Sequence, residues 1–393
     1  MLTLRGRPEP RRGCSLTEVN AITDGAALIR DGIIVEVGPS RRLENLAEAR
    51  LAVEIDASGR VVMPGFIDSH THLAFPSSPD SQDEATRRVR ACTGQRIEAR
   101  TRTHLEAMAR HGTTTVEAKT GCIGDESAES KLLRVLNALC GDPLDVVPSF
   151  FCRPPHDDAP ATEWILAELL PKIHKRKIAP FADIACTGEG GLTPFYDHYL
   201  NAAHEIGFAC RVHADSPHPA DAVDLAVRHA VAGIDHLEHA SAEDARRIGE
   251  ARLMTTLLPI SSLPFGRALP PARALIDAGA GVSIATDFDP HHSPTLNMQT
   301  AIALACLYLG MTIEEAISAA TINAAHAVGR ATRIGSIEPG KLADIVVLNI
   351  ADYRDLRNSL GTNVVHLTIK NGRVIYQEGE VASRLVPIER LSA

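Results

Sequence analysis

Short apolar stretches rich in β-branched residues recur along residues 61–286, and polar stretches of helical character follow them. Such alternation is typical of a parallel sheet whose strands are joined by crossover helices. Eight strand-and-helix units favour a closed (β/α)8 barrel of the TIM type, an α/β fold. A doubly wound open sheet is the competing arrangement, but no glycine-rich phosphate fingerprint follows the first strand. The predicted strands are 61–67, 113–118, 145–151, 182–186, 208–213, 233–238, 253–258 and 281–286.

Both ends of the chain show a different pattern, with short strands and tight hairpin signals. Asp31-Gly32 interrupts one apolar pair of strands, and Asn371-Gly372 interrupts another. Such dipeptides favour two-residue β-hairpins. We therefore expect residues 1–60 and 340–393 to form a small β-sandwich lobe, with a metal-dependent barrel over residues 61–339 between its halves.

Composition narrows the possible partners. The 393 residues carry a formal net charge of -9 and contain no long basic run, which argues against binding to nucleic acid or to an anionic membrane. The opening residues lack the apolar run of a secretory signal, and the longest later apolar run is about half of a membrane span. The sequence predicts a soluble, cytoplasmic protein that acts on a small molecule, and it leaves a homodimer open.

Polar residues that suit a metal ion stand at the ends of four predicted strands. In a closed barrel the carboxyl ends of all strands meet at one rim, so these side chains should converge there. Neutral imidazoles and a carboxylate are suitable ligands for Zn²⁺ or Fe²⁺. A single histidine at a strand end is more often a hydrogen-bonded core or surface residue. Five candidate ligands at one rim favour a metal site: His70, His72, His213, His236 and Asp287.

Several motifs carry a family resemblance. The stretches "PGFIDSHTHLAF", "TTTVEAKTG", "RVHAD", "DHLEHAS" and "ATDFDPHHSPT" resemble the amidohydrolase superfamily, and within it the imidazolonepropionases. The resemblance implies that His70, His72, His213 and Asp287 bind the metal, with Asp287 also acting as general base. His236 would hold the hydrolytic water or the substrate oxygen. Strand 182–186 ends without a lysine that could be carboxylated to bridge two metals, so the resemblance implies a single divalent ion.

The residues expected around the substrate depart from the family pattern. Ser216 stands three residues after His213, where the family carries a glutamate that shuttles a proton, and Glu189 is a candidate to replace it. Lys119 and His291 are further candidates for substrate contact. A hydroxyl cannot hold a proton near neutral pH, so we expect weak activity on imidazolone propionate.

Three functions are compatible with these residues. The first is hydrolysis of a C–N bond in a cyclic amide by metal-activated water, as in imidazolonepropionases. The alternative is a deaminase or an amidase-like enzyme that acts on another heterocyclic or amide substrate. The third is a catalytically silent barrel with a binding role, against which the complete set of metal ligands argues.

Overall fold

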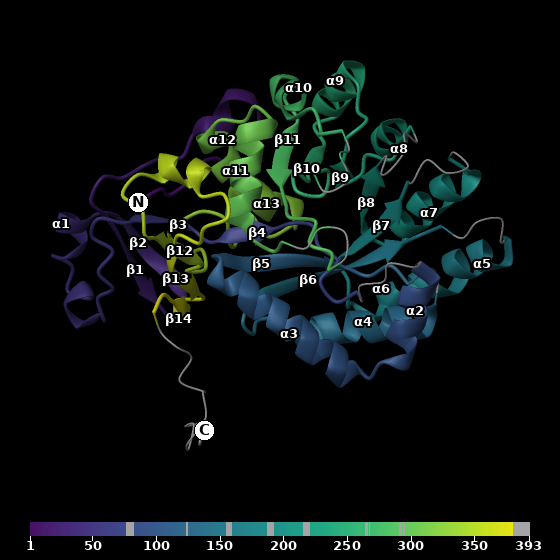
Figure 1. The fold of residues 1–393 in the computed structure, drawn as a ribbon, viewed down its shortest axis with the longest axis horizontal. Helices are drawn as coiled ribbons and strands as arrows, with labels where there is room; N and C mark the ends of the chain where they lie inside the picture. The colour runs from purple at the N-terminus through teal and green to yellow at the C-terminus, as the bar shows by residue number, and fades with distance from the viewer. Residues whose placement is uncertain are drawn as a thin grey trace, which may run out of the picture.

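The barrel strands lie in chain order. A computed structural model of the protein describes residues 1–75, 82–122, 125–154, 159–186, 192–214, 221–263, 266, 268–290, 293 and 295–379. Eight parallel strands form one sheet in which each strand pairs with the next along the chain (Figure 1). The predicted (β/α)8 barrel is therefore confirmed. The strands are β4 (Phe66–Asp68), β5 (Thr113–Lys119), β6 (Asp145–Cys152), β7 (Phe181–Ala185), β8 (Ala209–Ala214), β9 (Gly233–His236), β10 (Met254–Leu257) and β11 (Gly281–Ile284).

The seam between the first and last barrel strands is closed largely beyond their ends. Thr71 and Phe288 form a parallel bridge, and the amide of His72 donates to the carbonyl of Phe288 at 2.8 Å. Deeper in the barrel, the buried carboxylate of Asp68 accepts hydrogen bonds from the amide and the hydroxyl of Thr286, at 3.1 and 2.5 Å. A side chain thus completes the ring where the ladder of backbone hydrogen bonds stops.

Helices surround the barrel, and several begin at side chains that cap their amides. Ser241 and Thr312 start their helices with capping boxes, in which hydroxyl and carboxylate satisfy each other's backbone amides. None of the helices among the described residues is long and apolar enough to cross a membrane. The helices are α1 (Ser40–Leu43), α2 (Gln82–Ala91), α3 (Gly94–Arg110), α4 (Glu126–Ala138), α5 (Ala159–Trp164), α6 (Leu170–Arg176), α7 (Pro194–Glu205), α8 (Ala222–Arg228), α9 (Ala242–Glu250), α10 (Ala272–Asp277), α11 (Met298–Tyr308), α12 (Ile313–Ala319) and α13 (Ile322–Ala327).

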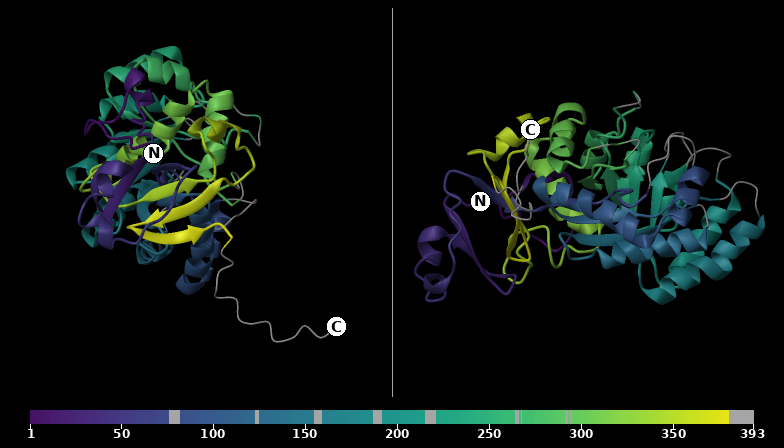
Figure 2. Two further views of the ribbon diagram at one scale, coloured as in Figure 1. Left: turned by 90° about the vertical axis from the view of Figure 1, so that its left-hand side faces the viewer. Right: turned by 60° about the horizontal axis from the view of Figure 1, so that its bottom comes forward.

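Segments from both ends of the chain lie side by side next to the barrel (Figures 1 and 2). β1 (Gly25–Arg30) and β2 (Ile33–Pro39) form one antiparallel hairpin, and β3 (Val61–Pro64), β12 (Ile345–Leu348), β13 (Val365–Lys370) and β14 (Arg373–Gln377) form a four-stranded sheet. Apolar residues of both sheets, among them Ile34, Ile345 and Ile369, share one buried cluster. Both hairpins turn at the predicted dipeptides, Asp31-Gly32 and Asn371-Gly372, with left-handed backbones.

One predicted strand was wrong in its extent. Residues 61–67 form two strands, because β3 pairs with β12 in the terminal sheet while β4 enters the barrel. Gly65 separates them, and a Cβ atom there would lie 2.3 Å from the side chain of Thr114. Only glycine allows the backbone to approach β5 this closely. At this residue the chain passes from the terminal sheet into the barrel sheet. The barrel sheet therefore begins at Phe66, whereas the division of the chain into two domains stays a prediction.

We predict that Asp68→Ala destabilises the barrel, because the substitution leaves two buried donors of Thr286 without an acceptor. Each unsatisfied donor costs about 1–3 kcal/mol. The midpoint of thermal unfolding should fall clearly, whereas Thr286→Ser, which keeps the hydroxyl, should lower it much less. An unchanged midpoint in Asp68→Ala would show that the backbone bridge closes the seam without the carboxylate.

Candidate metal centre

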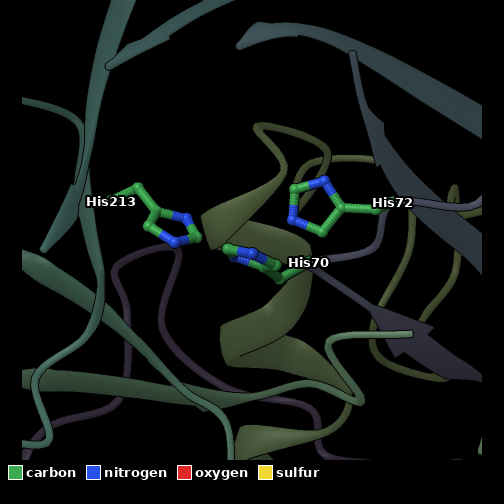
Figure 3. Close-up of side chains that lie close together, drawn as sticks. All are labelled: His70, His72 and His213. Atoms are coloured by element: carbon green, nitrogen blue, oxygen red, sulfur yellow. The ribbon is translucent and has the colours of Figure 1, made fainter. Parts of the chain in front are cut away.

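Four strand ends bring the five predicted side chains together. His70 and His72 follow β4, His213 lies in β8, His236 ends β9, and Asp287 follows β11. Ligand atoms of His70, His72 and His213 all lie within 4.8 Å of one another, and so do those of His70, His236 and Asp287. The rings of the first three point toward a common space (Figure 3). The arrangement offers a metal ion nitrogen and oxygen ligands from three directions.

Burial leaves several of these ring nitrogens without partners. Nε2 of His70, Nδ1 of His213 and Nε2 of His236 are buried and lack a hydrogen bond. The carboxylate of Asp287 lies 3.4 Å from Nε2 of His70 and 3.8 Å from Nε2 of His72. Unpaired buried polar atoms are costly unless something satisfies them. A divalent cation would satisfy the nitrogens of His70 and His213, so the residues present fit such an ion.

The environment holds the three predicted histidine ligands neutral. Burial lowers the pKa of His72 to about 3, and it lowers the pKa values of His70 and His213 well below the usual range. Neutral imidazole is the form that binds a metal. Burial also raises the pKa of Asp287 to about 7, although the charge of His236 opposes that rise.

His236 behaves differently from the other three rings. Burial by itself would lower its pKa, but the carboxylates of Glu238, Asp287 and Asp235 together outweigh burial and raise the pKa to about 9, with Glu238 contributing most. Nδ1 of His236 lies 3.0 Å from Oε1 of Glu238. This ring is therefore suited to donating a hydrogen bond to an oxygen, rather than to binding a cation.

Asp235 orients His70 from behind. Its Oδ2 accepts a hydrogen bond from Nδ1 of His70 at 2.8 Å, which leaves Nε2 as the nitrogen that faces the common space. A carboxylate behind a metal-binding histidine fixes its tautomer and strengthens it as a ligand. Asp235 was not among the residues expected from the sequence. A charged residue within an otherwise apolar buried strand is the signal that could have found it.

A group of buried charges lies next to Asp235 inside the barrel. Arg211 makes ion pairs of 2.7 Å with Asp235 and with Glu117. Lys119 reaches Asp183 at 2.5 Å, Asp235 at 3.1 Å and Glu117 at 3.2 Å. We call these five residues the buried cage. All have side chains at most 1% exposed, so each charge depends on its partners rather than on water.

The predicted substrate contacts are not all visible. Lys119 lies within the buried cage, where three carboxylates surround its ammonium group. Ser216, Glu189 and His291 fall outside the described residues. The roles predicted for these four residues stay predictions.

Arg153 is a second residue that sequence reasoning missed. It follows β6, two residues after Phe151, and its guanidinium carbon lies 4.9 Å from the centre of the Phe151 ring. That ring also contacts His72 and His213, with centroids 5.5 and 5.0 Å away. Among the described residues, Arg153 has neither a hydrogen bond nor an ion pair, and its Nε is buried. Its Nε donor is therefore unpartnered among the described residues, while the charges of Asp289 and Asp287 offset part of the cost of burying the guanidinium.

Comparison with known proteins agrees with this geometry. The model of the amidohydrolase family matches residues 61–375. The chain belongs to the amidohydrolase family.

Relatives of this amidohydrolase include two imidazolonepropionases that match it along nearly their whole length. The enzyme of Geobacillus kaustophilus is 34% identical over 93% of both chains. The enzyme of Porphyromonas gingivalis is 35% identical over 96% of this chain and 95% of its own.

Solved structures share the fold at low identity. Escherichia coli guanine deaminase has a TM-score of 0.74 at 16% identity, covering 96% of this chain and 97% of its own. A zinc-bound adenosine deaminase of Xanthomonas campestris has a TM-score of 0.70 at 17% identity, covering 90% of this chain and 88% of its own. These likenesses support the architecture of the amidohydrolase and carry no information on its substrate.

We predict that Asp235→Asn weakens metal binding by about 10- to 100-fold, the usual effect of losing a partner behind a ligand. The affinity for Zn²⁺ can be measured by competition with a coloured chelator. His72→Ala, which removes a predicted ligand itself, should weaken binding more.

The matched control is Asp197→Asn. Asp197 also contacts a histidine, since its carboxylate lies 2.7 Å from Nε2 of His229, but this pair lies at the surface. The control should bind Zn²⁺ as the unmodified protein does. Equal affinity in Asp235→Asn and Asp197→Asn would contradict an orienting role for Asp235.

Proposed function

We propose that this amidohydrolase opens a cyclic amide by hydrolysing a C–N bond, as imidazolonepropionases do, with imidazolone propionate itself reacting weakly because Ser216 replaces the family glutamate. The observation that carries the proposal is the convergence of buried, unpartnered histidine nitrogens and Asp287 at the barrel rim. Relatives named imidazolonepropionase, 34% and 35% identical along nearly the whole chain, support the choice of a cyclic amide.

His70, His72, His213 and Asp287 would hold one divalent metal ion, for which Zn²⁺ and Fe²⁺ both suit the donor set. When bound, such an ion supplies an activated water and polarises a carbonyl oxygen. The chain's own residues do the rest. Asp287 would take the proton from that water and pass it to the leaving nitrogen. His236 donates a hydrogen bond from Nε2 to the substrate oxygen as negative charge develops there.

Arg153 suits the other end of such a substrate. Its guanidinium lies over Phe151 and has an unpartnered Nε, and the Phe151 ring also contacts His72 and His213. Guanidinium groups bind carboxylates through paired hydrogen bonds. A cyclic amide with a carboxylate side chain could therefore place its ring at the histidines and its charge at Arg153.

A hydrolysis screen of the metal-loaded enzyme tests the proposal. Imidazolone propionate, other cyclic amides and aminated heterocycles should be compared for loss of substrate and for release of ammonia. Ring opening leaves both fragments joined and releases no ammonia, whereas deamination releases one equivalent. Turnover of cyclic amides without ammonia supports the proposal, and turnover confined to aminated heterocycles contradicts it.

We predict that Asp287→Asn lowers turnover by at least the ~10²-fold typical of a general acid or base. Asparagine keeps the size and one oxygen ligand but cannot take a proton. Elemental analysis must accompany the rates, because the expected result is retained metal with lost turnover. A metal-loaded Asp287→Asn enzyme of undiminished activity would exclude Asp287 as the base.

We predict that Arg153→Met selectively impairs substrates with a carboxylate. A hydrogen bond to a charged group contributes about 1.5–3 kcal/mol, so kcat/KM for imidazolone propionate should fall on the order of ten- to hundredfold. Methionine keeps an apolar stem on Phe151, and the methyl ester of the substrate should react almost equally with both enzymes. An equal loss on acid and ester would indicate a general defect and contradict the carboxylate contact.

A further inference from the structure

Glu238 is a buried carboxylate that has no assigned task in the reaction described above. It lies two residues beyond His236, the last residue of β9, and its side chain is 6% exposed. Its Oε1 lies 3.0 Å from Nδ1 of His236. Burying a carboxylate is costly unless its partners compensate, so this contact must matter to the local structure.

The backbone between the two residues is strained. His236 and Leu237 both have left-handed conformations, with φ of 73° and 71°. Within the described part of the chain, they are the only adjacent pair of non-glycine residues with positive φ. Such conformations persist where the surroundings impose them, and they cluster at functional sites. Here Leu237 is completely buried in the main core, which fixes the turn that carries Glu238 beside the ring.

The contacts of His236 leave one nitrogen free for chemistry. Nδ1 is hydrogen-bonded to Glu238. The ring of His213 packs against the ring of His236, with the two centroids 4.0 Å apart. Nε2 is buried and has no partner. Asp235, the nearest alternative carboxylate in the chain, is already occupied by His70, Lys119 and Arg211. Glu238 is thus the group that sets which nitrogen of His236 faces the substrate.

We propose that Glu238 is a positioning residue for His236. Its carboxylate accepts a hydrogen bond from Nδ1–H of His236. This bond fixes the plane of the His236 ring, so that Nε2 points at the substrate oxygen. The left-handed turn at His236 and Leu237 delivers the carboxylate to this position. The inference rests on the proposed function only for the identity of the substrate, because the hydrogen bond itself exists without one.

The test compares Glu238→Ala and Glu238→Gln in the Zn²⁺-loaded enzyme. Glutamine keeps an oxygen of the same reach but not the charge, so the ring should stay oriented and kcat should fall less than with alanine. Alanine removes the acceptor, and kcat should fall about 10- to 100-fold, as for other partners that orient a reacting group, with little change in KM or metal content. Glu315→Ala is the matched control, because Glu315 is a buried carboxylate that caps α12 and pairs with Arg273. It should lower the unfolding midpoint and leave kcat unchanged.

A spectroscopic measurement needs no substrate. In protein with ¹⁵N-labelled histidine, the His236 signals, assigned with His236→Asn, should show a hydrogen-bonded Nδ1–H in the unmodified protein and in Glu238→Gln. In Glu238→Ala they should show loss of that bond. Unchanged signals in Glu238→Ala would overturn the proposal, and so would a Glu238→Gln enzyme as slow as Glu238→Ala. If no cyclic amide reacts, the proposed function fails, and the His236 signals still decide the role of Glu238.

Discussion

The carboxylate of Asp235 is the contact on which the rest of the site depends. One oxygen accepts from Nδ1 of His70 and lies 3.1 Å from Lys119, while the other pairs with Arg211 at 2.7 Å. The same group therefore orients a predicted metal ligand and neutralises part of the buried cage. A shift of this side chain would disturb both, because interior packing leaves little room to compensate.

The buried cage explains how a barrel can carry charges under a metal centre. Removing one partner of a buried ion pair costs about 3–5 kcal/mol, because the other charge is left uncompensated. Each cation of the cage meets at least two carboxylates, so neither Lys119 nor Arg211 relies on a single partner, whereas Asp183 pairs within the cage only with Lys119. This redundancy gives His70 a rigid support. The neutral histidines lie next to the cage, and Arg153 lies over Phe151, whose ring contacts His72 and His213.

Strained backbone conformations occur at the residues whose side chains must point into the site. His236 at the end of β9, Leu237 next to it, and Asp287 three residues after β11 all have left-handed backbones. Each such residue costs about 1–3 kcal/mol and persists only because the surrounding structure imposes it. At β9 the strain brings Glu238 to His236, and after β11 it turns Asp287 toward His70 and His72. The stable barrel thus holds its reacting groups in conformations that isolated strands would not adopt.

Local patterns were sufficient to predict the barrel, the hairpins at both ends and the rim positions of His70, His72, His213, His236 and Asp287. These features depend on local periodicity, on turn dipeptides and on the rule that parallel strands share one carboxyl edge. The sequence did not predict that residues 61–67 form two strands, because this split depends on the close approach of Gly65 to Thr114 on another strand.

Which buried groups meet depends on how the chain packs in three dimensions. The partners of Asp235 come from β5, from β8 and from the second residue after β4, and His70 lies 165 residues away in the chain. The role proposed for Arg153 likewise depends on distant residues, because its guanidinium lies over the Phe151 ring, which also contacts His72 and His213. Local patterns indicate that a charged residue will be buried. Which opposite charge it meets depends on how strands that are distant in the sequence pack together.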